Sequence, residues 1–198
     1  MICMAALALA VAAGAQEGDD APASPGEDVA QVTAIESTAK QAASVLERSR
    51  HTGDAMPEEV AERIDAEARF GMNPGLARRA IASPASSLYL VPANGHVCAA
   101  LTVGDGATVS CPETADLAAG RSSAATVTLD GGAIAIYGLV PDGVDTVTVN
   151  TSHEGLEVAQ VVDNAYLAVV PDGTELSSVS YSGPSGAVEF PIYDPMAP

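Results

Sequence analysis

The feature that most constrains this chain is a change in the spacing of its apolar residues near residue 84. Beyond that point apolar residues recur at every second position, and Gly or Pro interrupts them every eight to twelve residues. Such alternation gives each short strand one apolar face, and the interruptions supply the turns between antiparallel strands. The pattern predicts an all-β C-terminal domain over residues 84–198, an antiparallel β-sandwich, Ig-like or related, with eight or nine strands.

Two of the expected strands are apolar at successive positions rather than at alternate ones. They are AIAIYGLV, residues 133–140, and AYLAVV, residues 165–170. A strand that is apolar on both faces must be covered on both faces. These two segments are therefore expected at the centre of the domain.

The same four residues, VPDG, follow both of these strands, at 140–143 and at 170–173. Pro fixes φ, Asp offers a local acceptor and Gly has a permissive backbone, so the repeat is interpreted as a tight turn used twice. The alternative is that Asp142 and Asp172 bind Ca²⁺. That reading is disfavoured because calcium sites gather several oxygen ligands in one loop, and each of these loops has one nearby acid.

The cysteine segment CAALTVGDGATVSC predicts a disulfide-bonded hairpin. If Gly104 and Asp105 form a two-residue turn, Val103 pairs with Gly106, and the register then sets Cys98 opposite Cys111. We therefore expect a disulfide between Cys98 and Cys111 that closes a loop of fourteen residues. A redox-active or metal-binding pair is the weaker alternative, because the chain lacks Cys-x-x-Cys spacing and zinc would need more ligands than one nearby histidine.

The part of the chain before residue 84 has helical rather than alternating periodicity. Apolar residues at spacings of three and four, together with capping and stop signals, predict an α-helical segment over 29–83. The expected helices lie near 29–50, 57–70 and 74–82. The apolar stripe of the first helix consists of Val32, Ile35, Ala39, Ala42 and Leu46. Residues 16–28 carry no large apolar side chain and are interpreted as a disordered linker.

The first fifteen residues resemble an export signal. An apolar run too short to cross a bilayer precedes Ala13-Gly14-Ala15, a small-x-small cleavage pattern. Removal of this segment would also remove Cys3 and leave an even number of cysteines, which suits an oxidising compartment. The alternative is a remnant of a membrane anchor, and the lack of basic residues before Lys40 leaves open whether Met1 is the true start. Both readings predict a secreted or cell-surface protein.

The charge of the chain argues against two classes of partner. The formal net charge is −18. Beyond residue 81 the chain has thirteen acidic residues and one basic residue, Arg121, so the net charge of that part is −12. Nucleic acids and anionic membranes are bound through clustered Lys and Arg, so neither is expected as a partner. A cell-envelope component or another protein remains, and the acidity itself is interpreted as a solubility feature.

No residue pattern predicts a catalytic, cofactor-binding or metal site. The S-x-x-K match at Ser37–Lys40 lacks the companion motifs of the serine acyl-transferring enzymes. A triad could be assembled from His51, His96 or His153 only by free choice among many Ser and Asp residues. The glycosylation sequon at Asn150 is a frequent chance match. Sugar rings could stack only on the few tyrosines, if these were exposed. The tyrosines in question are Tyr89, Tyr166 and Tyr181.

Five segments resemble a family of uncharacterised exported proteins from high-GC Gram-positive bacteria. They are NPGLARRAI, LYLVPANGHVCAALTV, VSCPETADLAAG, IYGLVPDGVDTVTV and VVDNAYLAVVPDG, within residues 73–182. The recurrent pattern is a cysteine pair, then G-L-V-P-D-G-V with a T-V strand, then D-N before an aromatic strand. The resemblance implies an extracytoplasmic location and carries no activity. The start of this chain departs from the basic signal or membrane segment that is usual in the family.

Three functional hypotheses follow. The leading one is a non-enzymatic interaction or envelope module that is exported or displayed on the cell surface. The second is the sensor-like ectodomain of a membrane-anchored regulator. The third, a hydrolase, is the least favoured because no catalytic motif is present.

Overall fold

The computed structural model describes residues 37, 39–66, 70–151, 156–184 and 186–192. The expected signal segment 1–15 and linker 16–28 lie outside the described residues. Helical segments are residues 39–42, η1 (Ser44–Glu47), η2 (Thr52–Asp54), α2 (Glu58–Ala66), η3 (Pro74–Leu76) and α3 (Thr114–Ala118). Strands are β1 (Arg78–Ala82), β2 (Ser86–Ala93), β3 (His96–Val103), β4 (Gly106–Ser110), β5 (Ala125–Thr128), β6 (Ile134–Leu139), β7 (Thr146–Thr151), β8 (Leu156–Gln160), β9 (Ala165–Val170), β10 (Leu176–Gly183) and β11 (Gly186–Pro191).

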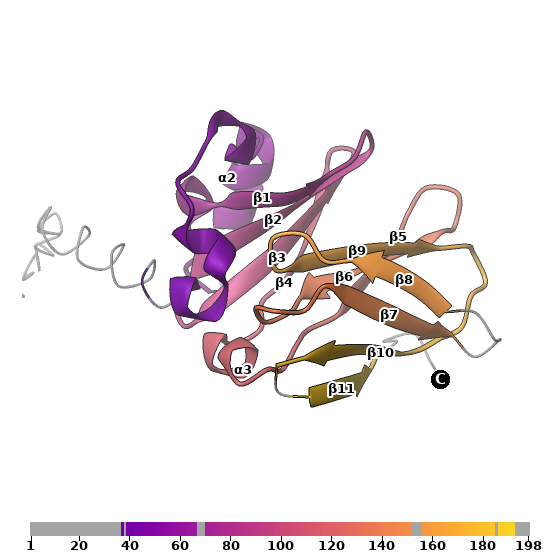
Figure 1. The fold of residues 1–198 in the computed structure, drawn as a ribbon. Helices are drawn as coiled ribbons and strands as arrows, with labels where there is room; N and C mark the ends of the chain where they lie inside the picture. The colour runs from indigo at the N-terminus through magenta and orange to yellow at the C-terminus, as the bar shows by residue number, and fades with distance from the viewer. Residues whose placement is uncertain (1–36, 38, 67–69, 152–155, 185, 193–198) are drawn as a thin grey trace, which may run out of the picture.

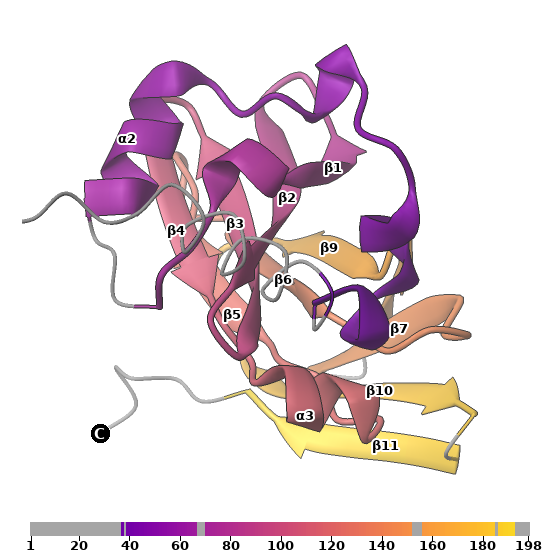
Figure 2. The same cartoon turned by 90° about the vertical axis from the view of Figure 1, so that its left-hand side faces the viewer.

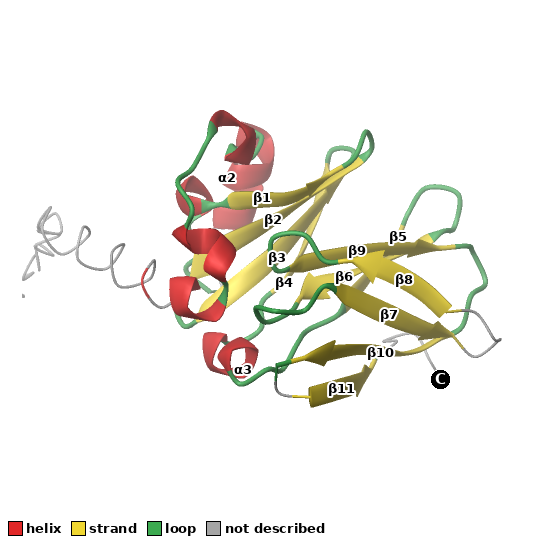
Figure 3. Cartoon of the chain, in the orientation of Figure 1, coloured by secondary structure: helices red, strands yellow, loops and turns green. Residues whose placement is uncertain are grey.

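The strands form three antiparallel sheets (Figures 1 and 3). Sheet A has the order β1-β2-β3-β4, sheet B has β5-β6-β9, and sheet C has β11-β10-β7-β8. The predicted all-β, antiparallel character of the C-terminal part is therefore confirmed. Within the described residues, ten strands lie beyond residue 84, more than the eight or nine predicted, and β1 precedes that point.

Three hydrophobic cores lie between the layers of the fold. The first core joins residues of sheets A and B and includes side chains from 39–46. The second core joins sheets B and C. The third lies on the opposite face of sheet A, where Val60 and Ile64 of α2 cover it. Sheet B therefore lies between the other two sheets.

The two segments that are apolar at successive positions form β6, the central strand of sheet B, and β9, an edge strand of that sheet. In β6, Tyr137 belongs to the core shared with sheet A, whereas its neighbour Ile136 belongs to the core shared with sheet C. In β9, Ala165 and Tyr166 divide between the two cores in the same way. The prediction is confirmed for β6, which is central and covered on both faces. It is only partly right for β9, because this strand lies at the edge of sheet B and Val169 is 49% exposed.

The helix predicted over 29–50 is shorter than expected at its C-terminal end. Residues 39–42 are helical, the 3₁₀ helix η1 follows, and residues 48–50 are not helical. The α-helical hydrogen bonding stops because the backbone N–H groups of Ser44 and Val45 donate to side chains from distant loops. Residues 29–36 lie outside the described part. Of the predicted apolar stripe, Ala39, Ala42 and Leu46 are buried.

The second predicted helix is present as α2. It begins at Glu58, directly after Pro57, and buries Val60 and Ile64 on one face, as the sequence spacing indicated. The described part of α2 ends at Ala66, and the predicted end near residue 70 stays a prediction, because residues 67–69 lie outside the described part. None of the helices in the described ranges has the length and apolar character needed to cross a membrane.

The third predicted helix, 74–82, is wrong beyond its first turn. Only Pro74–Leu76 is helical, and Arg78–Ala82 forms strand β1, which pairs with β2 from Arg78↔Leu90 to Ala82↔Ser87. An isolated helix of this length is marginal, whereas β2 offers a complete set of backbone partners. Ser83 and Pro84, interpreted as a helix stop, instead belong to the β1–β2 turn, where the Ser83 N–H donates to the Ser86 carbonyl.

The cysteine segment forms the β3–β4 hairpin in the predicted register. Gly104 has φ of 54°, Val103 pairs with Gly106, and Ala99 pairs with Ser110. The next pair in this register is Cys98 with Cys111, and the two sulfur atoms are bonded at 2.07 Å. Both cysteines belong to the core between sheet A and α2. The disulfide therefore fastens the sheet face that α2 covers.

Removing this disulfide is expected to lower the free energy of unfolding by about 3 kcal/mol, because the bridge restricts a loop of about fourteen residues in the unfolded chain. The test is urea unfolding of the oxidised protein, of the reduced protein and of the double variant Cys98→Ala/Cys111→Ala. We expect the reduced protein and the variant to unfold at similar, lower urea concentrations. Coincident curves for all three samples would contradict the expected contribution.

Candidate binding cleft

The two VPDG copies both form turns, as predicted. Gly143 and Gly173 have φ of 82° and 73°, values that favour glycine. The copies differ in what their aspartates contact. Asp142 accepts hydrogen bonds from other segments, whereas Asp172 lies against Gly132 of the β5–β6 turn. Turn chemistry accounts for the repeat, and only the first copy has a further role in fastening the fold.

Asp142 fastens the N-terminal segment to the loop after β6. Its Oδ1 accepts a hydrogen bond from the Ser44 hydroxyl at 2.6 Å and one from the Ser44 backbone N–H at 3.2 Å. The side-chain amide of Asn164 donates to the same oxygen at 2.8 Å. We call Ser44, Val45, Asp142 and Asn164 the Asp142 cluster.

Asn164 connects the loop between β8 and β9 to this cluster. Asp163 and Asn164 both have positive φ, 52° and 64°, and form the two-residue turn between Val162 and Ala165. Asn164 is buried, donates to the Val140 carbonyl and accepts from the Val45 N–H. The G-L-V-P-D-G-V and D-N motifs noted in the sequence are thus adjacent in space, although Asp142 and Asn164 are 22 residues apart in the chain.

The hydrogen bonds of the cluster keep Asp142 charged. Partial burial raises the pKa of Asp142, but hydrogen bonds from Ser44 and Asn164 outweigh burial and hold this pKa below the ordinary value for aspartate. The carboxylate is therefore ionised at neutral pH.

Changing Asp142 to asparagine is expected to destabilise the protein by about 1 kcal/mol, because a charged acceptor is lost from an exposed site. Asp172→Asn is the matched control, since it makes the same chemical change in the second VPDG turn. We expect Asp172→Asn to unfold within about 0.5 kcal/mol of the wild-type protein. Thermal or urea unfolding of the two variants side by side checks the difference, and equal losses would contradict the role of Asp142.

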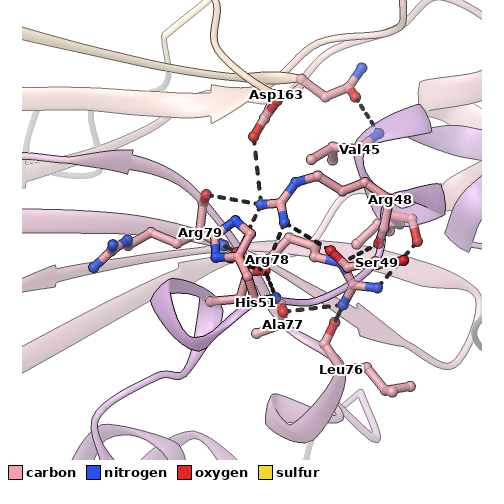
Figure 4. Close-up of polar contacts among 12 residues, drawn as sticks. Val45, Arg48, Ser49, His51, Leu76, Ala77, Arg78, Arg79 and Asp163 are labelled. Atoms are coloured by element: carbon pink, nitrogen blue, oxygen red, sulfur yellow. Dashed lines mark hydrogen bonds and ion pairs between the residues drawn. The ribbon is translucent and has the colours of Figure 1, made fainter.

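A second polar cluster includes Arg48, which directly follows η1, and Arg79 of β1 (Figure 4). Asp54 is fully buried and receives both terminal nitrogens of Arg48, each at 2.7 Å. The backbone N–H groups of His51 and Arg79 also donate to the Asp54 carboxylate, at 3.0 and 2.9 Å. Arg48 additionally lies 3.7 Å from Asp163. The hydrogen bonds from Arg48 chiefly hold the pKa of Asp54 far below its ordinary value. We call Arg48, His51, Asp54 and Arg79 the Asp54 cluster.

Arg78 is buried beside this cluster and binds backbone carbonyls (Figure 4). Its guanidinium donates to the carbonyls of Arg48, Leu76 and Ala77 at 3.0, 2.8 and 3.3 Å. These bonds join β1 to the residues that follow η1. Together with the Asp142 cluster they make residues 39–54 an integral part of the fold.

A cleft of about 160 Å³ opens where the N-terminal segment, α3 and sheet C meet. Figure 2 shows α3 beside β10 and β11, and the Tyr181 hydroxyl donates to the Gly120 carbonyl at 2.6 Å. We call this hollow the α3 cleft. Its lining includes Gln41, Ala42, Leu117, Ala118, Pro141, Asp142, Tyr181, Pro184 and Val188. Asp142 is the one charged side chain among the described lining residues.

The outer face of sheet C carries a second, shallower hollow of about 570 Å³. Thr146 and Thr148 of β7 point away from the core because Val147 and Val149 point into it. Ser180 and Ser182 of β10 and Glu189 of β11 complete a polar lining. We call this hollow the sheet C groove. No other sheet among the described elements packs on this face.

The histidines flagged in the sequence are not assembled into a triad within the described residues. His51 Nδ1 lies 3.6 Å from Asp54, but Arg48 already occupies both oxygens of that carboxylate. His96 Nδ1 forms a hydrogen bond with the Asn94 carbonyl. His153 lies outside the described residues. In the S-x-x-K match, Ala39 is buried in the first core and Thr38 lies outside the described part.

The three tyrosines considered for sugar contact are buried, and Asn150 of the glycosylation sequon is half-buried in β7. Tyr89, Tyr166 and Tyr181 are all buried, so none of them offers an exposed ring. Asn150 donates to the hydroxyls of Ser178 and Ser180. Among the residues that the structure describes, no three His, Cys, Asp or Glu side chains gather as metal ligands.

The sequence did not indicate the Asp54 cluster or the role of Asn164. The one available signal for Asn164 was the D-N pair, noted only as a recurrent motif. Comparison with family models, with curated proteins and with solved structures found no match for this chain.

Proposed function

We propose that this protein is an exported or cell-surface interaction module that catalyses no reaction. The observation that carries the proposal is the strand order of β5–β11. Sheets β5-β6-β9 and β11-β10-β7-β8 face each other across one core, and this supports a seven-strand Ig-like sandwich of the fibronectin type III kind. Sandwiches of this type commonly serve as recognition domains on cell surfaces, and by analogy this fold supports an interaction role.

Two further observations support an extracytoplasmic interaction module. The Cys98–Cys111 disulfide suits an oxidising compartment. The sheet C groove offers hydroxyl and carboxylate groups on a sheet face that no described element covers. A cell-envelope component or another protein is the proposed partner. The resemblance to exported proteins of high-GC Gram-positive bacteria agrees with this location and remains a prediction.

The second candidate is the sensor-like ectodomain of a membrane-anchored regulator. The observation that favours it is the attachment of residues 39–54 to the sandwich through the Asp142 and Asp54 clusters. A change at the α3 cleft would act directly on Asp142 and hence on the segment nearest a proposed N-terminal anchor. A hydrolase is the least supported candidate, because the aspartate nearest His51 is bound by Arg48.

The location can be tested on the native host protein. We expect peptide sequencing to give a mature chain that begins at Gln16, and differential thiol labelling to find Cys98 and Cys111 oxidised. An uncleaved, longer chain with oxidised cysteines would favour the anchored sensor over the released module. Reduced cysteines in a cytoplasmic fraction would contradict both candidates.

The interaction role can be tested by capture from cell-envelope fractions. Thr148→Arg places a bulky cation in the sheet C groove, whereas Thr128→Arg makes the same change at the exposed end of β5. We expect a specific partner to be captured by the wild-type protein and by Thr128→Arg, and to be lost with Thr148→Arg. Equal capture by both variants would place the interaction elsewhere on the molecule.

A further inference from the structure

We propose that the α3 cleft binds the alkylammonium group of a lysine side chain on a partner protein. This inference rests on the proposed interaction function and adds the chemistry of the ligand. It follows from the charge, the size and the hydrogen bonding of the cleft.

The charge of the cleft favours a cation. Asp142 carries a negative charge at the cleft wall, and the three hydrogen bonds to its Oδ1 come from neutral groups of Ser44 and Asn164. The surrounding part of the chain is strongly acidic, with Arg121 as its one basic residue beyond residue 81. A cationic partner would be attracted to this surface before contact and would balance the Asp142 charge on binding.

The size and walls of the cleft favour an aliphatic stem. A volume of about 160 Å³ corresponds to about five water molecules. This is below the range of about 300–1,000 Å³ usual for drug-sized ligands and cofactors. Ala42, Leu117, Pro141 and Pro184 supply apolar wall that an aliphatic chain can cover. A single extended side chain therefore fits better than a nucleotide or an oligosaccharide.

The hydrogen-bonding pattern favours lysine over arginine. Because Oδ1 of Asp142 already accepts three hydrogen bonds, the carboxylate cannot offer two open oxygens to a planar guanidinium. An ammonium group acts as a point charge and needs only one oxygen. Tyr181 also lines the cleft, but its ring is buried and its hydroxyl donates to the Gly120 carbonyl, so the ammonium group is recognised through Asp142.

The experiment measures binding of two matched probes to the full chain. The probes are Nα-acetyl-lysine methylamide and its uncharged counterpart Nα-acetyl-norleucine methylamide, followed by NMR titration. We expect the lysine probe to bind with Kd of about 1 mM, and the norleucine probe to bind at least about tenfold more weakly, because a charged contact is missing. Arginine methylamide, acetylated in the same way, should also bind more weakly than the lysine probe.

Three variants locate the binding. Asp142→Asn removes the charge, and Ala118→Leu fills the cleft from the exposed side of α3 while leaving the Asp142 cluster intact. Both should weaken lysine binding at least about tenfold. Asp172→Asn makes the same charge change in the other VPDG turn and should bind as the wild-type protein does. If Asp142→Asn unfolds, Ala118→Leu still decides the outcome.

Three results would overturn the inference. Lysine binding that survives Ala118→Leu unchanged would place the ligand outside the cleft, and equal binding of the lysine and norleucine probes would exclude charge recognition. Tighter binding of free cadaverine than of the lysine probe would indicate a free amine and would overturn a protein-borne ligand. The proposed location outside the cytoplasm is tested without any ligand, so its failure is distinguishable from failure of this inference.

Discussion

Gly138→Ala is expected to destabilise the protein by about 3 kcal/mol or more, or to prevent folding, because its new methyl group has no space. Gly138 lies in β6, and a Cβ built there would come 1.9 Å from the Ser123 carbonyl oxygen. That oxygen is backbone and accepts a hydrogen bond from the buried Tyr166 hydroxyl at 3.0 Å. The clash cannot be relieved without moving the segment that leads into β5.

The matched control is Gly106→Ala in β4. Its added Cβ would lie 3.3 Å from the nearest atom, the Val103 carbonyl oxygen, and neither Gly106 nor Gly138 has positive φ. Backbone conformation is therefore comparable, and only the space around the two glycines differs. We expect Gly106→Ala to change the free energy of unfolding by no more than about 1 kcal/mol in either direction. Urea unfolding compares the free energies of unfolding of the two variants. Similar small losses at both positions would contradict the prediction, because they would show that the backbone leading into β5 can move to make room for the methyl group.

Asp54→Asn is expected to lower the free energy of unfolding by about 3 kcal/mol at neutral pH. The substitution leaves Arg48 without its bidentate carboxylate in a site where Asp54 is fully buried. The Arg48 side chain is 29% exposed. Solvent therefore screens the pair in part, and the expected loss of unfolding free energy is at the lower end of the range for breaking a buried ion pair. The exposed pair Arg121–Asp116 serves as control, since Asp116→Asn should cost less than about 1 kcal/mol.

The contribution of Asp54 should depend on pH with a definite sign. Its pKa in the folded protein is depressed, chiefly by hydrogen bonds from Arg48, below the value of about 3.9 for an unfolded aspartate. The stabilisation is therefore complete well above pH 4 and decreases as the pH falls below about 4 toward the folded-state pKa. We expect the difference in unfolding free energy between the wild-type protein and Asp54→Asn to be constant from pH 8 to about pH 5 and to narrow below about pH 4. A difference that stays constant down to pH 2 would contradict this account.

Short-range sequence patterns were sufficient for the local features of the fold. The Gly104-Asp105 turn fixed the β3–β4 register, and that register alone brought Cys98 opposite Cys111. Apolar residues on both faces placed β6 at the centre, because a strand covered on both sides has no solvent-facing positions for polar residues. The same pattern did not place β9 correctly, since β9 is an edge strand of sheet B and leaves Val169 exposed. The VPDG turns were also predictable from the sequence, because the geometry of a tight turn depends on four adjacent residues.

The candidate site could not be predicted, because its members come from segments that only the folded chain brings together. Ser44 and Asp142 are 98 residues apart, and Arg48 meets Asp54 beside β1 rather than along a helix. No sequence spacing distinguishes Asp142 from Asp172, although the structure gives them different partners.

The sequence by itself determined the alternating strands, their turns, the disulfide register and the acidity of the C-terminal part, since each depends on residues within one hairpin or on composition. The tertiary structure decided that Arg78–Ala82 is a strand, that the first helix stops before η1, and that an acidic cleft lies beside α3. In each case a backbone or side chain distant in sequence offered hydrogen bonds or apolar contact that the local segment could not supply. Local propensity amounts to tenths of a kcal/mol per residue, so such distant partners outweigh it.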